Sequence, residues 1–309
     1  MSKKIFLLLI LFLSLSVFTG LYFGAAELSP DIFRLRLCRI ITGLIAGAGL
    51  AVSGVIFQGI LRNPLAEPYV LGVSSGAGVG AVLGLFFNLS LQTIPVLAFF
   101  GAGITMLIVY NLAKVNGRVS TQNLLLSGVI VGAVFSSILL FLVSISPNEA
   151  IHGITWWLLG SLQVFDIPLL ATVSILVLCG IGIALFLTRE LNAISLGEEE
   201  ALHLGVNVDT VKRLLFVVAS LITGSIVCVC GIIGFIGLII PHAVRSIIGS
   251  DHRQVLPASA IAAGAFLILA DTLSRVIMPP VEIPIGVITA FIGGPVFILL
   301  LRKKIKSPF

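Results

Sequence analysis

Charged residues are scarce in this sequence. Lysine, arginine, aspartate and glutamate together make up 10% of its 309 residues, whereas a soluble domain carries roughly 25%. Apolar residues reach 58%, and the mean hydropathy is +1.21. A chain with so few charges cannot cover a water-exposed surface. An ordinary soluble domain is therefore excluded, and an integral membrane protein is expected.

Signatures of catalysis are missing as well. The sequence contains no HExxH and no GxSxG motif. Its four histidines are His152, His203, His242 and His252. It also lacks the GxxxxGKS/T loop that cradles nucleotide phosphates. We therefore expect no enzymatic activity from this chain, and we expect that any pumping is powered by another subunit.

Ionisable residues are almost absent from the apolar runs, which leaves an ion-coupled secondary transporter with little support. Asp271 is the main candidate for a coupling site, and Arg275 lies four residues further along the same helix face. We expect this pair to lie near the outer boundary of the membrane and to neutralise itself there rather than carry protons. The ion-coupled transporter is kept as an alternative function.

Cysteines are few, and none forms a recognisable metal motif. They are Cys38, Cys179, Cys228 and Cys230. Three of them lie inside apolar runs, where a thiol behaves as a small hydrophobe. Cys228 and Cys230 are two residues apart, so they point to different sides of a helix. No disulfide and no metal site is expected.

Long apolar runs recur down the whole chain. A run of about 20 residues spans a bilayer core of ~30 Å as a helix, and helices satisfy their own backbone hydrogen bonds in lipid. The ~10-residue alternating segments of a membrane barrel are not seen. Ten candidate spans cover approximately residues 5–25, 40–60, 66–86, 91–113, 121–143, 167–188, 212–232, 233–248, 255–277 and 284–301. We predict an all-α membrane protein of about ten transmembrane helices, forming one domain over residues 1–309.

Two features at the margins of these runs need interpretation. The first run, Ile5–Ala26, follows Lys3 and Lys4 and could pass for a signal peptide, but its length favours a first membrane helix. The segment Ile151–Leu162 contains a Trp-Trp pair, which is typical of a membrane interface. We predict a short helix there, lying along the outer surface. The longest polar stretch, Arg189–Lys212, is predicted to be a loop.

The cations are distributed unevenly between the two sides. With the N-terminus in the cytoplasm, fourteen of the 18 lysines and arginines fall inside. The fourteen are Lys3, Lys4, Arg62, Lys114, Arg118, Arg189, Lys212, Arg213, Arg245, Arg253, Arg302, Lys303, Lys304 and Lys306. This bias favours cytoplasmic termini and an even number of spans. It also explains the net charge of +5 without nucleic-acid binding.

Four arginines, Arg34, Arg36, Arg39 and Arg275, fall on the outer side against this bias. Long cationic side chains can reach water from an interfacial position at little cost. A basic landing site for an acidic partner in the periplasm is the other interpretation. Charge distribution alone does not separate the two.

Several segments, in this order along the chain, resemble a known family. They are RLCR (36–39), GAGLAVSGVIFQGILRNPLAEP (47–68), LGVSSGAG (71–78), WLLGSL (157–162), LGEEEALHLGVNV (196–208), GFIGLIIPH (234–242), DHRQVLP (251–257), ADTLSR (270–275) and EIPIGVITAFIGG (282–294). Together they resemble the iron-chelate/vitamin B12 permease family (FecCD type) of bacterial ABC importers, which has the type II importer permease fold. One departure is Cys38, where the family usually has proline.

The resemblance implies a homodimer that encloses one pathway in the bacterial inner membrane. It also implies three kinds of partner besides membrane lipid: a second copy of the chain, two cytoplasmic ATPase subunits, and a periplasmic or lipid-anchored binding protein. No cofactor is expected on this chain. The family carries iron–siderophore, haem, cobalamin, molybdate and tungstate. We expect an iron chelate, with a molybdate or tungstate importer as the alternative.

The resemblance also assigns roles to individual residues. The residues implied to dock the binding protein are Arg36, Arg39 and Arg275, but not Arg34. The residues implied to form the cytoplasmic gate are Asn63, Leu65, Thr121 and Gln122. The segment implied to couple to the ATPase is a loop of about residues 189–211, in particular Leu196, Gly197, Glu198, Glu199, Ala201, Leu204 and Gly205.

The residues of the coupling loop support this role independently. Glu198 and its two acidic neighbours suit a helix N-terminus because they complement the helix dipole. Gly205 suits a helix stop, in a backbone conformation that other residues resist. A short capped helix at the cytoplasmic face would act as a rigid lever. A solvated loop is the alternative.

Overall fold

The computed structural model describes residues 3–24, 27, 29–115, 118–164 and 166–306, with side chains as far as Leu299 except those of Val115 and Arg118. The long helices are α1 (Lys3–Tyr22), α2 (Pro30–Ile60), α4 (Thr93–Ala113), α5 (Thr121–Ser144), α7 (Ile167–Phe186), α10 (Val208–Cys230), α12 (His252–Val276) and α13 (Ile285–Lys306). The shorter ones are η1 (Pro68–Leu71), α3 (Val73–Phe86), α6 (Asn148–Leu159), α8 (Thr188–Leu196), α9 (Glu198–His203) and α11 (Ile236–Ile248). The side chains of five cations counted above, Arg118, Arg302, Lys303, Lys304 and Lys306, lie outside the described set, as do both chain ends.

All ten predicted spans correspond to helices. Among the described residues, seven helices are at least 18 residues long and apolar enough to cross a membrane. Three shorter apolar helices, Val73–Phe86, Ile236–Ile248 and Ile285–Leu299, account for the others. The predicted all-α membrane fold is therefore confirmed.

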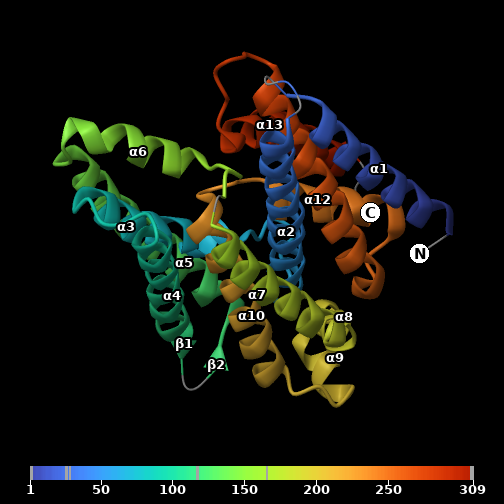
Figure 1. The fold of residues 1–309 in the computed structure, drawn as a ribbon. Coiled ribbons are helices and arrows are strands. Elements are labelled where there is room, and N and C mark those ends of the chain that lie inside the picture. The colour runs from blue at the N-terminus through green and yellow to red at the C-terminus, as the bar shows by residue number, and fades with distance from the viewer. Residues whose placement is uncertain (1–2, 25–26, 28, 116–117, 165, 307–309) are drawn as a thin grey trace.

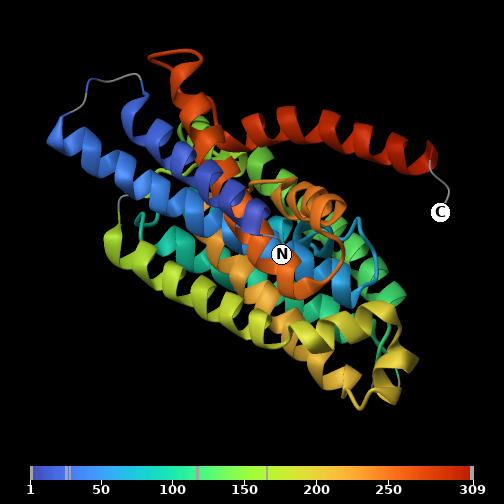
Figure 2. The same cartoon turned by 90° about the vertical axis from the view of Figure 1, so that its right-hand side faces the viewer.

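Helix α2 forms the axis of the bundle and packs against α10, α11 and α12 (Figures 1 and 2). Two glycines allow these close approaches. A Cβ on Gly47 would collide with the backbone of Ala263 on α12, and one on Gly54 would collide with the backbone of Gly237 on α11. Small residues at such points let helix backbones touch, which drives association in lipid.

The bundle has two distinct ends. In Figure 1, α6 and the beginning of α13 lie at one end, and α8, α9 and the strands β1 (Lys114–Val115) and β2 (Arg118–Val119) lie at the other. Arg39 and Gln58 on α2 are 19 residues apart, a rise of about 28 Å at ~1.5 Å per residue. That length matches a hydrocarbon core of ~30 Å. We call the Arg39 end the outer end and the Gln58 end the inner end.

The predicted loop 189–212 was wrong over its first half. Residues Thr188–Leu196 form helix α8, which buries Thr188, Leu191, Ala193 and Ile194 along one face. Its polar residues lie on the other face, so the segment reads as polar although it is amphipathic. Further along, Glu198–His203 form α9, the short helix predicted within this stretch, and Val208–Lys212 already belong to α10.

Helix boundaries differ from the predicted spans in two places. Helix α2 begins ten residues earlier, at Pro30, where Ser29 caps it by accepting a hydrogen bond from the Ile32 amide. Helix α3 begins later, at Val73, because Pro68 opens a 3₁₀ turn that ends at Gly72 with a φ of 79°. The short helix predicted over 151–162 is confirmed as α6.

Candidate docking, gate and coupling sites

The three arginines predicted to dock a binding protein gather at the outer end. Arg39 on α2 grips the carboxylate of Asp271 on α12, with a closest distance of 2.7 Å. Its Nη1 donates to Glu282, in the segment before α13, at 2.9 Å. Asp271 also forms an ion pair with Arg275, whose Nε lies 3.1 Å from Oδ2, as the sequence spacing predicted. Four charges on three segments therefore neutralise one another.

The guanidinium groups of Arg36 and Arg275 donate hydrogen bonds to backbone carbonyls at the end of α1. Arg36 donates to the carbonyls of Leu21 and Tyr22 at 2.7 and 3.1 Å. Arg275 donates to the carbonyl of Gly20 at 3.1 Å. The last carbonyls of a helix lack intrahelical partners, so cations are favourable there. Arg36 and Arg275 are buried within the protomer, and their docking role stays a prediction.

At the inner end, α8, α9 and the first turn of α10 form a separate unit with its own small core. Ala193, Ile194, Ala201 and Val208 cluster there, apart from the main core of the bundle. The residues predicted to couple to an ATPase, Leu196 to Gly205, belong to this coupling unit. Its surface is unusually apolar for a segment between membrane helices: Leu196, Leu202 and Leu204 are 75%, 59% and 67% exposed.

Two glycines shape the coupling unit. Gly205 has a φ of 80° in the turn after α9, which confirms the predicted backbone conformation. Its amide donates to the carbonyl of Leu202, closing the end of the helix. Gly197 separates α8 from α9, and a Cβ there would collide with the carboxylate of Glu200. The turn after α9 therefore depends on Gly205, whereas the Glu200 side chain could move aside for a Cβ at position 197, and the role of both glycines in coupling stays a prediction.

The predicted gate residues lie where α2 ends and where α5 begins. Asn63 Oδ1 accepts the Leu65 amide at 2.9 Å, fixing the turn, and Leu65 is exposed. Thr121 opens α5 with Gln122, and the Thr121 hydroxyl is buried without a hydrogen-bond partner in the described part of the chain. Within one protomer, no hydrogen bond between described residues joins the two pairs.

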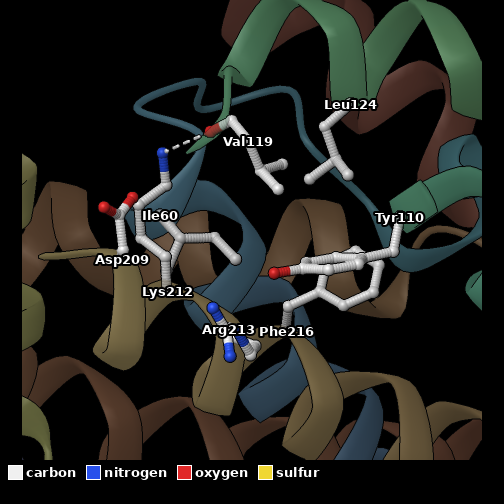
Figure 3. Close-up of a pocket in the computed structure, with 8 residues that line it drawn as sticks. All are labelled: Ile60, Tyr110, Val119, Leu124, Asp209, Lys212, Arg213 and Phe216. Atoms are coloured by element: carbon white, nitrogen blue, oxygen red, sulfur yellow. Dashed lines mark hydrogen bonds between the residues drawn. The ribbon is translucent and has the colours of Figure 1, made fainter. Parts of the chain in front are cut away.

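A small cavity of about 20 Å³ lies between the gate and the coupling unit (Figure 3). Its walls are the apolar side chains of Ile60, Val119, Leu124 and Phe216, together with Tyr110, whose hydroxyl points into it (Figure 3). Lys212 passes along one side, and its Nζ reaches the carbonyl of Val119 at 3.4 Å. The same nitrogen binds Glu198, the first residue of α9, at 2.9 Å. Sequence reasoning missed this lysine because the two partners are far from it in the chain.

A second polar tie joins the coupling unit to α12. Asn192 on α8 donates to Asp251 Oδ1 at 2.8 Å and accepts the His252 amide at 2.9 Å. Asp251 also caps α12 by accepting the Arg253 amide. These hydrogen bonds, first that from Asn192, lower the pKa of Asp251 below its ordinary value, so the carboxylate stays charged at neutral pH. These residues line an open hollow of about 620 Å³ with Arg62, Asn63 and Arg245.

The chain between α10 and α11 is irregular and depends on Glu67 and Tyr69, which sequence reasoning also missed. Glu67 accepts the amide of Phe235, the N-cap of α11, at 3.0 Å. The Tyr69 hydroxyl accepts the Ile233 amide at 3.3 Å. Irregular backbone in a membrane bundle needs such internal partners. The signal was the acidic residue in RNPLAEP, a polar group inside an otherwise apolar region.

Comparison with known proteins agrees with this architecture. The FecCD transport family matches residues 6–303. The cobalamin import system permease protein BtuC of Halobacterium salinarum is 43% identical over 298 residues, covering 94% of this chain and 79% of that one. The hemin transport system permease protein HmuU of Yersinia pestis is 39% identical, covering 88% and 83%.

A solved structure confirms the fold. It is described as an inward-facing conformation of an ABC transporter of the metal-chelate type, and it is 35% identical to this chain. The two superpose with a TM-score of 0.89 over 97% of this chain and 99% of that one. The chain is thus a multi-pass membrane permease of the ABC importer type, and it belongs to the FecCD transport family.

Proposed function

We propose that two copies of this chain form the translocation pathway of an importer in the bacterial inner membrane, with both termini in the cytoplasm. A binding protein delivers the cargo at the outer end, and two ATPase subunits act on the inner end. Oligomers of identical subunits are most often two-fold symmetric, which suits a single pathway between two bundles. The chain itself holds neither ATP nor Mg²⁺ in this scheme.

The exposed leucines of the coupling unit carry the proposal. Leu196, Leu202 and Leu204 lie on a segment that projects from the inner end rather than along the lipid-facing sides (Figure 1). Exposed apolar patches outside the membrane mark protein-binding surfaces. The adjacent Glu198–Glu200 run adds negative charge beside this patch. A partner with an apolar groove and basic margins fits this surface, and we assign it to the ATPase subunit.

The gate assignment is part of the same proposal. Asn63 and Leu65 follow α2, while Thr121 and Gln122 open α5, so both pairs lie at the inner end. Their side chains are polar or apolar but uncharged, which suits a constriction that must release its cargo. In a dimer the two copies would supply two sets of these residues around one opening.

We infer an iron chelate as the cargo, with haem and cobalamin as related possibilities. The relatives named above are described as carrying cobalamin and hemin, so the family accepts large metal-containing molecules. A molybdate or tungstate importer is the second candidate. Uptake of radioactive iron as ferric siderophores, haem, cobalamin and molybdate by cells with and without the permease gene would separate these cargoes.

The ATPase assignment is tested by placing a charge in the leucine patch. We expect Leu204→Glu to prevent co-purification of the cognate ATPase subunit and to abolish ATP-dependent uptake, because a carboxylate would be desolvated at the interface. Thr210→Glu places the same charge on an exposed residue of the same unit, in the first turn of α10, that is not one of the three leucines. That control should assemble normally. Normal assembly of Leu204→Glu would mean that the ATPase binds elsewhere.

A further inference from the structure

The coupling unit packs on the bundle through Leu191 of α8, which is buried in the main core beside Gly59 of α2, and it makes few polar contacts with other elements. Its small core of Ala193, Ile194, Ala201 and Val208 holds α8, α9 and the first turn of α10 together as one unit. Two side chains tie it to other elements. Asn192 holds the beginning of α12, and Lys212 holds the end of β2. A force applied to the unit reaches the rest of the protomer partly through these ties.

Lys212 is placed between the two functional segments of the inner end. Its Nζ is 2.9 Å from Glu198 Oε1, at the beginning of α9, and 3.4 Å from the carbonyl of Val119. Val119 is two residues before Thr121, the first residue of α5 and a predicted gate residue. The lysine side chain is buried, so its ammonium group has these two protein oxygens as its partners.

The surroundings allow the segment after β2 to move. The cavity beside Lys212, of about 20 Å³, separates Val119 and Leu124 from Tyr110 and Phe216 (Figure 3). The Thr121 hydroxyl is buried but has no hydrogen-bond partner among the described residues. A packed interface with a void and an unpaired donor is less constrained than a close-packed one.

We propose that Lys212 is the positioning residue that transmits movement of the coupling unit to the gate at the beginning of α5. The inference rests on the proposed function, since it assumes that the ATPase acts on the coupling unit and that Thr121 and Gln122 belong to the gate. The ion pair with Glu198 makes Lys212 follow α9. Its contact with the Val119 carbonyl then draws β2 and the first turn of α5 in the same direction.

A cation with a long stem is required for this role. The ammonium group donates to a carboxylate and a carbonyl at once, whereas methionine, a neutral side chain of similar length, has no donor. Arginine offers the same charge and more donors, so it should serve in its place. Methionine keeps the apolar stem and its packing around the cavity but loses both contacts. Arg213 is the matched control, because it is the adjacent cation and lines the same cavity (Figure 3).

The first experiment measures cargo transported per ATP hydrolysed by the reconstituted importer. We expect Lys212→Met to lower this ratio roughly tenfold, within the range that loss of coupling between two sites produces. ATP hydrolysis itself should persist. Lys212→Arg should restore the ratio, and Arg213→Met should leave it unchanged. A normal ratio in Lys212→Met would overturn the inference.

Hydrogen exchange separates transmission from simple destabilisation. In the wild-type complex, a non-hydrolysable ATP analogue should change amide exchange both in residues 198–206 and in residues 118–124. In Lys212→Met the first response should persist and the second should disappear. If both responses persist, Lys212 is not the link. If the wild type shows no response in 198–206, the proposed site of ATPase action is wrong instead.

Discussion

At the outer end of α2, two guanidinium groups and two carboxylates neutralise one another, whereas at the inner end single polar contacts join separate elements. Arg275 and Asp271 are buried, and Arg39, whose side chain is 12% exposed, holds two carboxylates at once. Such a network is costly to break, because each member left alone is a buried charge. The outer end is therefore a rigid junction of α1, α2 and α12.

The inner end is less completely paired. Arg245 on α11 has an amide oxygen, that of Gln58, as its hydrogen-bonding partner, in place of a carboxylate. Three buried polar atoms near this end, on Thr121, Glu190 and His252, have no hydrogen-bond partner among the described residues. Buried polar atoms are nearly always paired in complete structures, through protein or water. Their presence here suits an end that is completed by a partner and changes shape.

This difference in pairing implies that the outer end of α2 is fixed and that its inner end can move. A bundle that opens at one end needs a junction that stays closed at the other. The outer network supplies the junction, and the inner ties supply contacts that can be exchanged. The comparison predicts a graded response to substitution, with stability affected most at the outer end and coupling affected most at the inner end.

The largest effect on stability is expected from Arg39→Met. It leaves Asp271, with a side chain only 4% exposed, to Arg275 alone and frees Glu282. Breaking a buried ion pair from one side costs about 3–5 kcal/mol. The thermal unfolding temperature in detergent should therefore fall sharply. Arg34→Met, at an exposed position on the same helix, is the control and should change little.

This result also governs how docking can be tested. Reversing Arg36 and Arg39 to glutamate would place two carboxylates against Asp271 or the carbonyls that end α1. The variant would lose the outer junction before it lost a partner. Loss of binding in that variant therefore says little about docking unless its unfolding temperature is normal. If Arg39→Met had the same unfolding temperature as Arg34→Met, the outer network would not be a rigid junction.

The next effect is expected at Gly205, where the φ of 80° suits glycine. A β-branched residue held in this region costs about 1–3 kcal/mol. No neighbouring atom obstructs a Cβ there, so the cost is backbone strain rather than a clash. Gly205→Val should displace the turn after α9 and lower transport per ATP hydrolysed. Gly205→Asn is the control, since asparagine tolerates this conformation. If Gly205→Val and Gly205→Asn transported equally per ATP hydrolysed, the conformation of this turn would not matter for coupling.

Much of the fold could be predicted because membrane spans depend on local composition. The ten apolar runs each became a helix, and the Asp271–Arg275 pair followed from a spacing of four residues. Gly205 was predicted correctly for the same reason, since the end of a short helix is a local feature. What these successes share is a signal within a few turns of chain.

The parts that were missed depend on contacts between distant segments. Lys212 reads as a topological cation, and its link to Val119 exists only because α10 packs beside β2. Glu67 and Phe235 are far apart in sequence but meet at the break before α11. The buried state of Arg36 and Arg275 was also invisible, because an arginine at a helix end looks the same in sequence whether it faces water or protein oxygens.

A smaller effect is expected from Asn192→Ala, which removes the tie between α8 and α12. Hydrogen bonds of this kind contribute about 1 kcal/mol. The lowered pKa of Asp251 means that its stabilising contacts are present above its unfolded pKa and are lost as pH falls through the folded value. The stability difference between wild type and Asn192→Ala should therefore be constant near neutral pH and shrink in acid. A difference that grows in acid would contradict this account.

The smallest effect is expected from Glu282→Gln, at the exposed margin of the outer network. Glu282 accepts Arg39 Nη1 at 2.9 Å and Gln163 Nε2 at 2.6 Å, but its side chain is 33% exposed. Solvent screens such pairs, so the loss should be below about 1 kcal/mol. The amide oxygen of glutamine can still accept one of the two donors, and Arg39 keeps Asp271.

The remaining difference in stability between Glu282→Gln and wild type should shrink further in about 1 M salt, where charges are screened within ~3 Å. Thermal unfolding at low and high salt measures both quantities, with Gln163→Ala as the matched variant that removes the neutral donor. A loss as large as that of Arg39→Met, unchanged by salt, would show that Glu282 rather than Asp271 holds the junction closed.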